Sequence, residues 1–279
     1  MKVPHKLPLP VCTSITAAVL ALVPAAPAVS GGPRDHIMGR ACDSRAIYPK
    51  TSENFVLWAA RNDIQLAKLL EHCEASREQL QTRWLGASAP QRWRPRCEIV
   101  VHDTRNSYLR ATGQANLRSL GASRIRRGSA GITSRRIDVL VDASGELPAL
   151  AHELSHVVLA DHFPGAPPPA WADEGIAMLA DCERKRALHR RDARAALRSG
   201  THLRLVELLT LFELPARPHV PAFYGQSLAL VEYLTEHYDR DRLLPFLAAA
   251  QTSGYDRALQ IHYEIPGIVE LERRWRQQL

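Results

Sequence analysis

The residues with the clearest chemical potential are His152, Glu153 and His156, in the segment His-Glu-Leu-Ser-His. Two histidines four positions apart lie on one face of a helix, so both imidazoles can bind one metal ion. Catalytic zinc takes three protein ligands and keeps a position open for water, and two histidines with a glutamate are a recurrent set. Glu174 is the candidate third ligand, and Glu153 is the candidate general base toward zinc-activated water. The pattern predicts one Zn²⁺ per chain.

The context of this motif decides how much weight it carries, because a short motif also occurs by chance. Apolar residues give 150–159 a helical face, and the proline-rich stretch 164–169 predicts a loop after it. A second helical run containing Glu174 follows that loop. The alternative is a solvated surface helix with two unrelated histidines. The complete context favours the metal site.

Two segments, HELSH and PPAWADEG, resemble the gluzincin branch of the zinc metallopeptidases, and within it the peptidase MA-like family of exported bacterial proteins. The resemblance runs from about residue 51 to the C-terminus and is strongest over 150–178. It implies a zincin-like fold. It also implies that Glu174 is the third zinc ligand, within a W-x-x-E-G-x-A context formed by Trp171, Glu174, Gly175 and Ala177.

Tyr224 is the candidate oxyanion stabiliser, because the family resemblance places a tyrosine at this sort of position near a helix start. A phenol can donate a hydrogen bond to the oxygen that becomes negative during attack on a carbonyl. The alternative is a packing tyrosine whose hydroxyl meets a backbone group. His219 and His237 are weaker substitutes, and Gln226 and Ser227 are further candidates to line the pocket.

Asp173 and Asp181 are candidates to orient the histidine ligands, which usually donate their other ring N–H to a carboxylate or carbonyl. Thermolysin-like enzymes place an aspartate four residues after the ligand glutamate, whereas this chain has Met178 there. The alternative for Asp173 is a solvent-facing position at a helix start, where negative charge is favourable. The sequence leaves the partners of the imidazoles open.

The elements around the motif predict an α+β fold: a small mixed sheet with helices in an N-terminal lobe (51–160), the HExxH helix at the junction, and an all-helical C-terminal lobe (161–279) closing a cleft. His102, which follows the second strand, is predicted to be structural rather than a ligand. The predicted strands are 54–58, 97–101 and a hairpin over 123–143 with its turn at 133–136. The predicted helices are 63–85, 203–214, 222–238, 241–251 and 265–276, and 106–111 is a short helix or a turn.

One strand is expected to have a functional role of its own. In zincins that resemble this protein, an antiparallel edge strand lies beside the active-site helix and pairs with the substrate backbone. Such strand addition tolerates different side chains. The sequence does not indicate which strand forms the edge.

Residues 1–28 have the features of a signal peptide: a basic start, an apolar core at 11–23 and an Ala26-Pro27-Ala28 cleavage site. The core is shorter than the roughly 20 residues that a membrane span needs. An uncleaved anchor is the alternative. We expect an exported, periplasmic or secreted protein with no stable membrane span after signal removal, in which residues 29–50 form a leader into the fold.

Cysteines and charge add two further expectations. Four cysteines remain after processing, and an even number in an exported protein favours disulfides, with buried free thiols as the alternative; they are Cys42, Cys73, Cys97 and Cys182. Loss of Lys2 and Lys6 lowers the formal net charge from +7 to +5. The arginine-rich run 184–198 predicts a solvated helix and no nucleic-acid binding, because no aromatics are interleaved for base stacking.

Together these observations predict an exported zinc metallohydrolase, foremost a peptidase acting on a peptide or protein substrate. In this hypothesis Glu153 takes a proton from water and later protonates the leaving amine, while Tyr224 steadies the oxyanion. The alternative from another class is a catalytically silent, zinc-stabilised binding or scaffold protein. A third interpretation, an anionic-polymer binder, depends on charge alone. Substrate, cleavage specificity and oligomeric state are not predicted.

Overall fold

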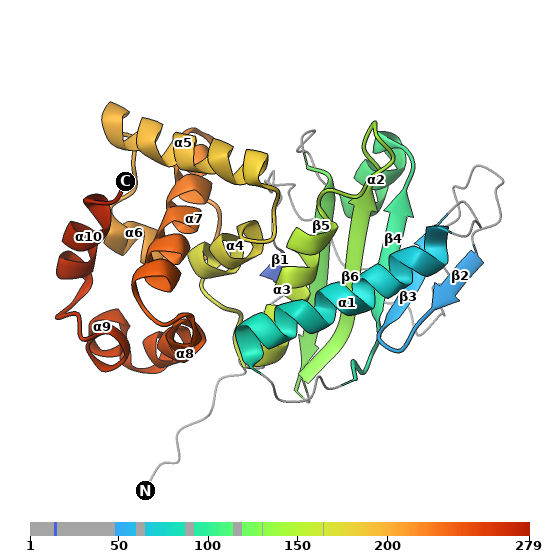
Figure 1. Ribbon diagram of the computed structural model, residues 1–279, viewed down its shortest axis with the longest axis horizontal. Coiled ribbons are helices and arrows are strands. Elements are labelled where there is room, and N and C mark those ends of the chain that lie inside the picture. Colours follow the sequence, from blue (N-terminus) through green and yellow to red (C-terminus); the bar gives the residue numbers. More distant parts are fainter. Residues whose placement is uncertain are drawn as a thin grey trace, which may run out of the picture.

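The computed structural model describes residues 14–15, 48–59, 65–86, 92–113, 119–129, 131–163 and 165–279. A β-sheet with its helices forms one side of the molecule and a group of helices forms the other, with α3 and α4 between them (Figure 1). The fold is therefore mixed α+β, as predicted.

The sheet has the strand order β1-β5-β6-β4-β3-β2. Strands β3, β4 and β6 are parallel, whereas β5 is antiparallel to β6 and β2 is antiparallel to β3. The short β1 pairs antiparallel with the outer edge of β5. The bounds are β1 Ser14–Ile15, β2 Tyr48–Thr51, β3 Phe55–Ala59, β4 Cys97–His102, β5 Gly121–Gly128 and β6 Gly131–Leu140.

Helices cover the sheet on both faces, and the alternation of side chains along β6 separates the two. Ile137 and Val139 point into a core shared with α1 (Gln65–Leu85) and α3 (Leu150–His162). Leu140 points the other way and packs with Tyr108 of α2 (Arg105–Thr112). The helix that carries the HExxH motif thus lies on the face opposite α2.

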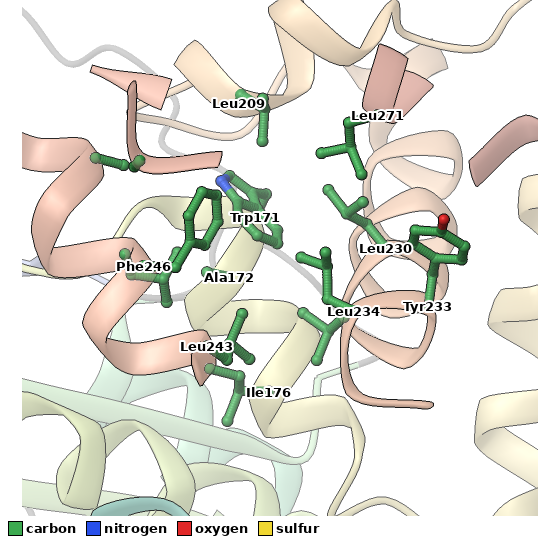
Figure 2. Packing of buried hydrophobic residues seen from close by; sticks show 14 of the residues in the cluster. Trp171, Ala172, Ile176, Leu209, Leu230, Tyr233, Leu234, Leu243, Phe246 and Leu271 are labelled. Carbon is green, nitrogen blue, oxygen red and sulfur yellow. The ribbon is translucent and has the colours of Figure 1, made fainter. Parts of the chain in front are cut away.

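The C-terminal side, residues 165–279, contains helices and no strand. Figure 2 shows its core, where Trp171 and Ile176 of α4 meet Leu230 and Leu234 of α7 and Phe246 of α8. The helices are α4 Ala170–Met178, α5 Glu183–Ser199, α6 Leu205–Thr210, α7 Val220–His237, α8 Leu243–Ser253, α9 Tyr255–Tyr263 and α10 Ile268–Arg276, with 3-10 turns at Arg217–His219 and Arg240–Arg242.

Two elements differ from the sequence prediction. The predicted hairpin turn at 133–136 is wrong: these residues belong to β6, and the chain reverses between Gly128 and Gly131, whose φ of 114° favours glycine. Helix α9 was not predicted. Its buried residues include Leu259 and Tyr263, four positions apart, which is helical spacing.

The N-terminal predictions fall mostly outside the described residues. Within 1–47 only β1 is described, and it lies inside the predicted signal peptide. Strand β2 begins at Tyr48, so the fold starts within the segment predicted as a leader. Among the described residues, no helix combines the length and apolar character needed to cross a membrane.

Candidate metal centre

Helix α3 places the motif in the interior because the helix is packed on nearly every side. Every residue from His152 to Ala160 is buried. Leu154 and Val157 face the core under the sheet, and Leu159 faces the helical core. Near the end of the helix, the Asp161 carboxylate accepts hydrogen bonds from the Trp93 indole and the Arg135 guanidinium. Burial on nearly every side makes α3 a central element of the fold, and it places the polar side chains of the motif in the interior.

Helix α4 brings Glu174 to α3, and two features of its sequence hold it in place. The Trp171 Nε1–H donates to the Tyr255 hydroxyl at 3.0 Å, which in turn donates to the Leu209 carbonyl at 3.0 Å. A Cβ on Gly175 would lie 2.6 Å from the Ser227 carbonyl oxygen of α7. Because only glycine permits this approach, α4 and α7 pack backbone to backbone beside the site.

The structure brings His152, His156 and Glu174 together as a group able to hold a metal ion. One ligand atom from each lies within 4.8 Å of the others, and His152 Nε2 is 3.6 Å from a Glu174 carboxylate oxygen. The two imidazole rings are 5.0 Å apart, centroid to centroid. Donors around one zinc, each at about 2 Å, are roughly 3 to 3.5 Å from one another, so a small adjustment suffices.

Both aspartates considered in the sequence lie behind the histidines. Asp181 is 3.2 Å from His152 Nδ1, and Asp173 is 3.0 Å from His156 Nδ1. Lys185 donates to the second Asp181 oxygen at 2.8 Å. The chain has no aspartate four residues after Glu174, where thermolysin-like enzymes have one. Instead, the turn after α4 places Asp181 against His152. In both imidazoles Nδ1 faces an aspartate, so Nε2 faces the side where Glu174 lies.

Electrostatics favours positive charge between these groups. Burial by itself would lower the pKa of His152, but the Asp181 and Glu174 carboxylates raise it to about 10. Asp173 likewise raises the pKa of His156 against the effect of burial. The two imidazoles hold the pKa of Glu174 below its usual range although burial opposes this. A proton or a metal ion would satisfy the same attraction.

Glu153 lies against the start of β5. Among the described strands, only the two-residue β1 lies outside β5 on this side of the sheet. A Cβ on Gly121 would come within 2.7 Å of its carboxylate, so glycine is required there. The Tyr108 hydroxyl fixes this strand by donating to the Gly121 carbonyl at 2.6 Å. Burial raises the pKa of Glu153, which suits a group that takes and returns a proton. Sequence reasoning missed Gly121 and Tyr108.

Tyr224 lies in the second turn of α7, close to the two glutamates. Burial, together with the negative charges of Glu174 and Glu153, raises its pKa well above the usual range. Among the described residues, no hydrogen bond of the Tyr224 hydroxyl is found, and its role as oxyanion stabiliser stays a prediction. Its ring contacts those of Phe223 and His189.

The weaker candidates on α7 lie elsewhere. His219 is half-buried and its Nδ1 is 3.2 Å from the Thr201 carbonyl, and His237 Nδ1 is 3.1 Å from the Tyr233 carbonyl. Both ends of the Gln226 amide bond the backbone of Leu203 at 2.8 Å. The polar atoms of Gln226 therefore hold the segment before α6, and its place in the lining of a pocket stays a prediction.

Four buried polar atoms in the cluster have no hydrogen-bond partner among the described residues: His156 Nδ1, His156 Nε2, Glu174 Oε2 and Glu153 Oε2. His156 Nδ1 still has its ion-pair contact with Asp173, so the other three are the candidates to bind a ligand. Buried polar groups are nearly always paired, so a set of unpaired atoms close together indicates a missing ligand. Imidazole nitrogens and a carboxylate are donors that zinc accepts. The residues present therefore fit a metal ion.

The cysteines and His102 complete the account of sequence candidates. Cys73 and Cys97 are buried free thiols and Cys182 is an exposed one, whereas Cys42 lies outside the described residues. His102 is bonded on both ring nitrogens, to Ser107 and Asp138, so it is structural as predicted.

The fold and the site define a mixed α+β protein with two histidines of an HExxH helix and a glutamate from the next helix arranged to hold a metal ion. A family model described as the peptidase MA superfamily matches residues 141–279, which include α3, α4 and all later helices. The chain belongs to the peptidase MA superfamily, and this membership suggests a metallopeptidase-like activity. Comparison with curated proteins gives no match.

Proposed function

We propose that this protein is an exported, gluzincin-type zinc metallopeptidase. The observation that carries the proposal is the set of buried metal-ligating atoms without a hydrogen bond on His156, Glu174 and Glu153, beside the oriented ring of His152. His152, His156 and Glu174 would hold Zn²⁺. When bound, zinc supplies a Lewis acid that makes a water more acidic and polarises a carbonyl oxygen.

The chain's own residues would perform the proton transfers. Glu153 is on the same helix turn as His152 and is pressed against Gly121, so its carboxylate has a fixed position beside the ligand set. Its raised pKa lets it accept a proton from the attacking water and deliver that proton to the leaving amine. The Tyr224 phenol stays protonated at neutral pH and would donate to the oxygen that becomes negative.

The start of β5 would align the substrate. This strand is next to Glu153, and its outer edge accepts antiparallel pairing, as Ser14 and Ile15 do opposite Ile125 and Arg124. If residues 1–28 are removed as a signal peptide, the edge becomes free for an extended peptide. Main-chain hydrogen bonds along the edge would then bind substrates of different sequence.

A zinc-stabilised binding or scaffold protein without turnover is the second candidate. The observation that favours it is the deep burial of the site, where Glu153 is only 3% exposed and Glu174 2%. Hydrolysis requires a peptide to reach these groups. A scaffold requires only that the metal holds α3 to α4.

Two variants separate these functions. Purified protein is expected to contain about one zinc per chain, and His156→Ala should lose it. Glu153→Gln should keep the metal but lower cleavage of a mixed, internally quenched peptide library by roughly 10²- to 10⁴-fold, the usual contribution of a general base. Retention of zinc by His156→Ala would refute the ligand assignment. If zinc-loaded protein cleaves no peptide, the peptidase function is refuted and the scaffold function is supported.

A further inference from the structure

His189 is a polar side chain next to the site to which the proposed mechanism gives no task. It lies on α5, one turn after Lys185 and two turns after Asp181, the carboxylate behind His152. Its Nδ1 is buried and has no hydrogen-bond partner among the described residues. A buried polar atom without a partner costs stability, so a ligand group that hydrogen-bonds this atom would bind favourably.

The position of His189 is set by direct contact between two helix backbones. A Cβ on Gly225 of α7 would lie 2.5 Å from the His189 carbonyl oxygen and 2.6 Å from the Ala193 nitrogen. Only glycine permits α5 to lie this close to α7. Because Gly225 follows Tyr224, this contact fixes the two rings relative to each other, with their centroids 5.9 Å apart.

The surroundings of His189 suit a neutral hydrogen-bonding group. Burial, and then the positive charges of Lys185 and His152, lower its pKa despite the opposing effect of Asp181 and Asp192. A neutral imidazole has one donor nitrogen and one acceptor nitrogen. The free edge of a peptide main chain carries N–H and C=O groups, so either nitrogen of a neutral imidazole finds a complementary partner there.

We propose that His189 is a substrate-binding residue whose imidazole hydrogen-bonds the main chain of a peptide held beside Tyr224. This inference rests on the proposed peptidase function and deepens it. A peptide that pairs with β5 along one edge has its other edge unpaired. His189, on the helical side of the site, would bind that second edge. Binding to the main chain, away from Glu153, predicts an effect on substrate affinity rather than on proton transfer.

The experiment compares His189→Phe and His189→Gln with the wild type, all zinc-loaded, on the internally quenched peptide that the wild type cleaves best in a mixed library. Phenylalanine keeps a ring against Tyr224 but cannot hydrogen-bond, whereas glutamine keeps a donor and an acceptor. We expect KM to rise about 3- to 10-fold in His189→Phe, as for one lost hydrogen bond, with kcat within about twofold. His189→Gln should recover part of the affinity.

Matched measurements keep the result interpretable. His72→Phe, at an exposed histidine of α1, should leave KM unchanged. Binding of the same peptide to Glu153→Gln protein, with and without His189→Phe, should weaken by the same factor. If His189→Phe unfolds at a lower temperature than the wild type or loses zinc, the KM of His189→Gln decides the test. An unchanged KM in a folded, zinc-loaded His189 variant overturns this inference alone, whereas a wild type that cleaves no peptide overturns the proposed function and this inference with it.

Discussion

Two buried histidine clusters lie on opposite faces of the same sheet, and both pair histidine with aspartate. On the α2 face, His102 is 2.9 Å from Ser107 through Nδ1 and 2.9 Å from Asp138 through Nε2. Both Asp138 oxygens also accept from arginines, Arg124 at 2.9 Å and Arg136 at 2.8 Å. Every polar atom of the His102 ring and the Asp138 carboxylate therefore has a partner within the chain.

On the α3 face, the partners that the His152–His156–Glu174 cluster finds outside itself lie on its outer side, behind the histidines. Asp181 and Asp173 occupy the Nδ1 atoms, while His156 Nε2 and carboxylate oxygens of Glu174 and Glu153 have no hydrogen-bond partner among the described residues. Burial and histidine–aspartate pairing are common to both clusters, so neither distinguishes a metal site from a structural one. The convergence of unpaired donor atoms does.

The largest expected effect comes from disrupting the His102–Asp138 cluster, called the closed cluster because its polar atoms all have partners within the chain. Asp138→Asn removes the only buried negative charge that His102, Arg124 and Arg136 share in the described structure. Breaking a buried ion pair costs about 3–5 kcal/mol; we expect the lower end because Arg124 and Arg136 reach solvent. Urea unfolding measures this loss. Zinc content should not change, and a variant that loses zinc would show that the two clusters are not independent.

The next largest effect concerns the outer side of the His152–His156–Glu174 cluster, called the open cluster. Asp181→Asn keeps the size of the side chain but removes the charge that orients His152 through Nδ1. Loss of such a partner lowers metal affinity by about 10- to 100-fold. Competition with a zinc-binding dye measures the affinity. Asp192→Asn on α5 is the control, and it should bind zinc like the wild type; equal affinity in Asp181→Asn would contradict the orienting role.

The sequence predicted the open cluster better than the elements around it, for a physical reason. His152 and His156 are four apart on one helix, so their geometry follows from local structure. Glu174 needed the resemblance, because a loop separates α3 from α4. Asp181 and His189 depend on how the chain turns into α5, and Gly121 on a strand that packs from elsewhere. Long-range packing of this kind leaves no local pattern.

The misplaced hairpin turn has the same origin. Residues 133–136 are polar, a pattern that favours a turn, yet Arg135 contacts the Pro95 carbonyl and Asp161, and Arg136 contacts Asp138. Polar side chains can occupy a strand when distant partners satisfy them. The helices of the C-terminal side were predicted more fully, since their apolar spacing is a local property. Only α9, which follows Gly254 directly, was missed.

The pH dependence of stability should come in part from the closed cluster. Burial would raise the pKa of Asp138, but hydrogen bonds from Arg136 and His102 hold it well below its usual range. The folded-state pKa is thus below the unfolded value of about 3.9. The stabilisation is present above that value and is lost as pH falls toward the folded-state pKa. Between pH 5 and pH 3, the free energy of unfolding should fall less in Asp138→Asn than in the wild type.

The smallest expected effect tests whether the open cluster depends on surface charge. Lys185 donates to Asp181 at 2.8 Å, but its side chain is 44% exposed. An exposed pair contributes about 0 to 1 kcal/mol, so Lys185→Met should reduce zinc affinity by less than about fivefold. High salt should reduce the wild-type affinity toward that of Lys185→Met, because it screens the same charge. A loss as large as that of Asp181→Asn would mean that Lys185, rather than packing within the buried site, holds Asp181 against His152.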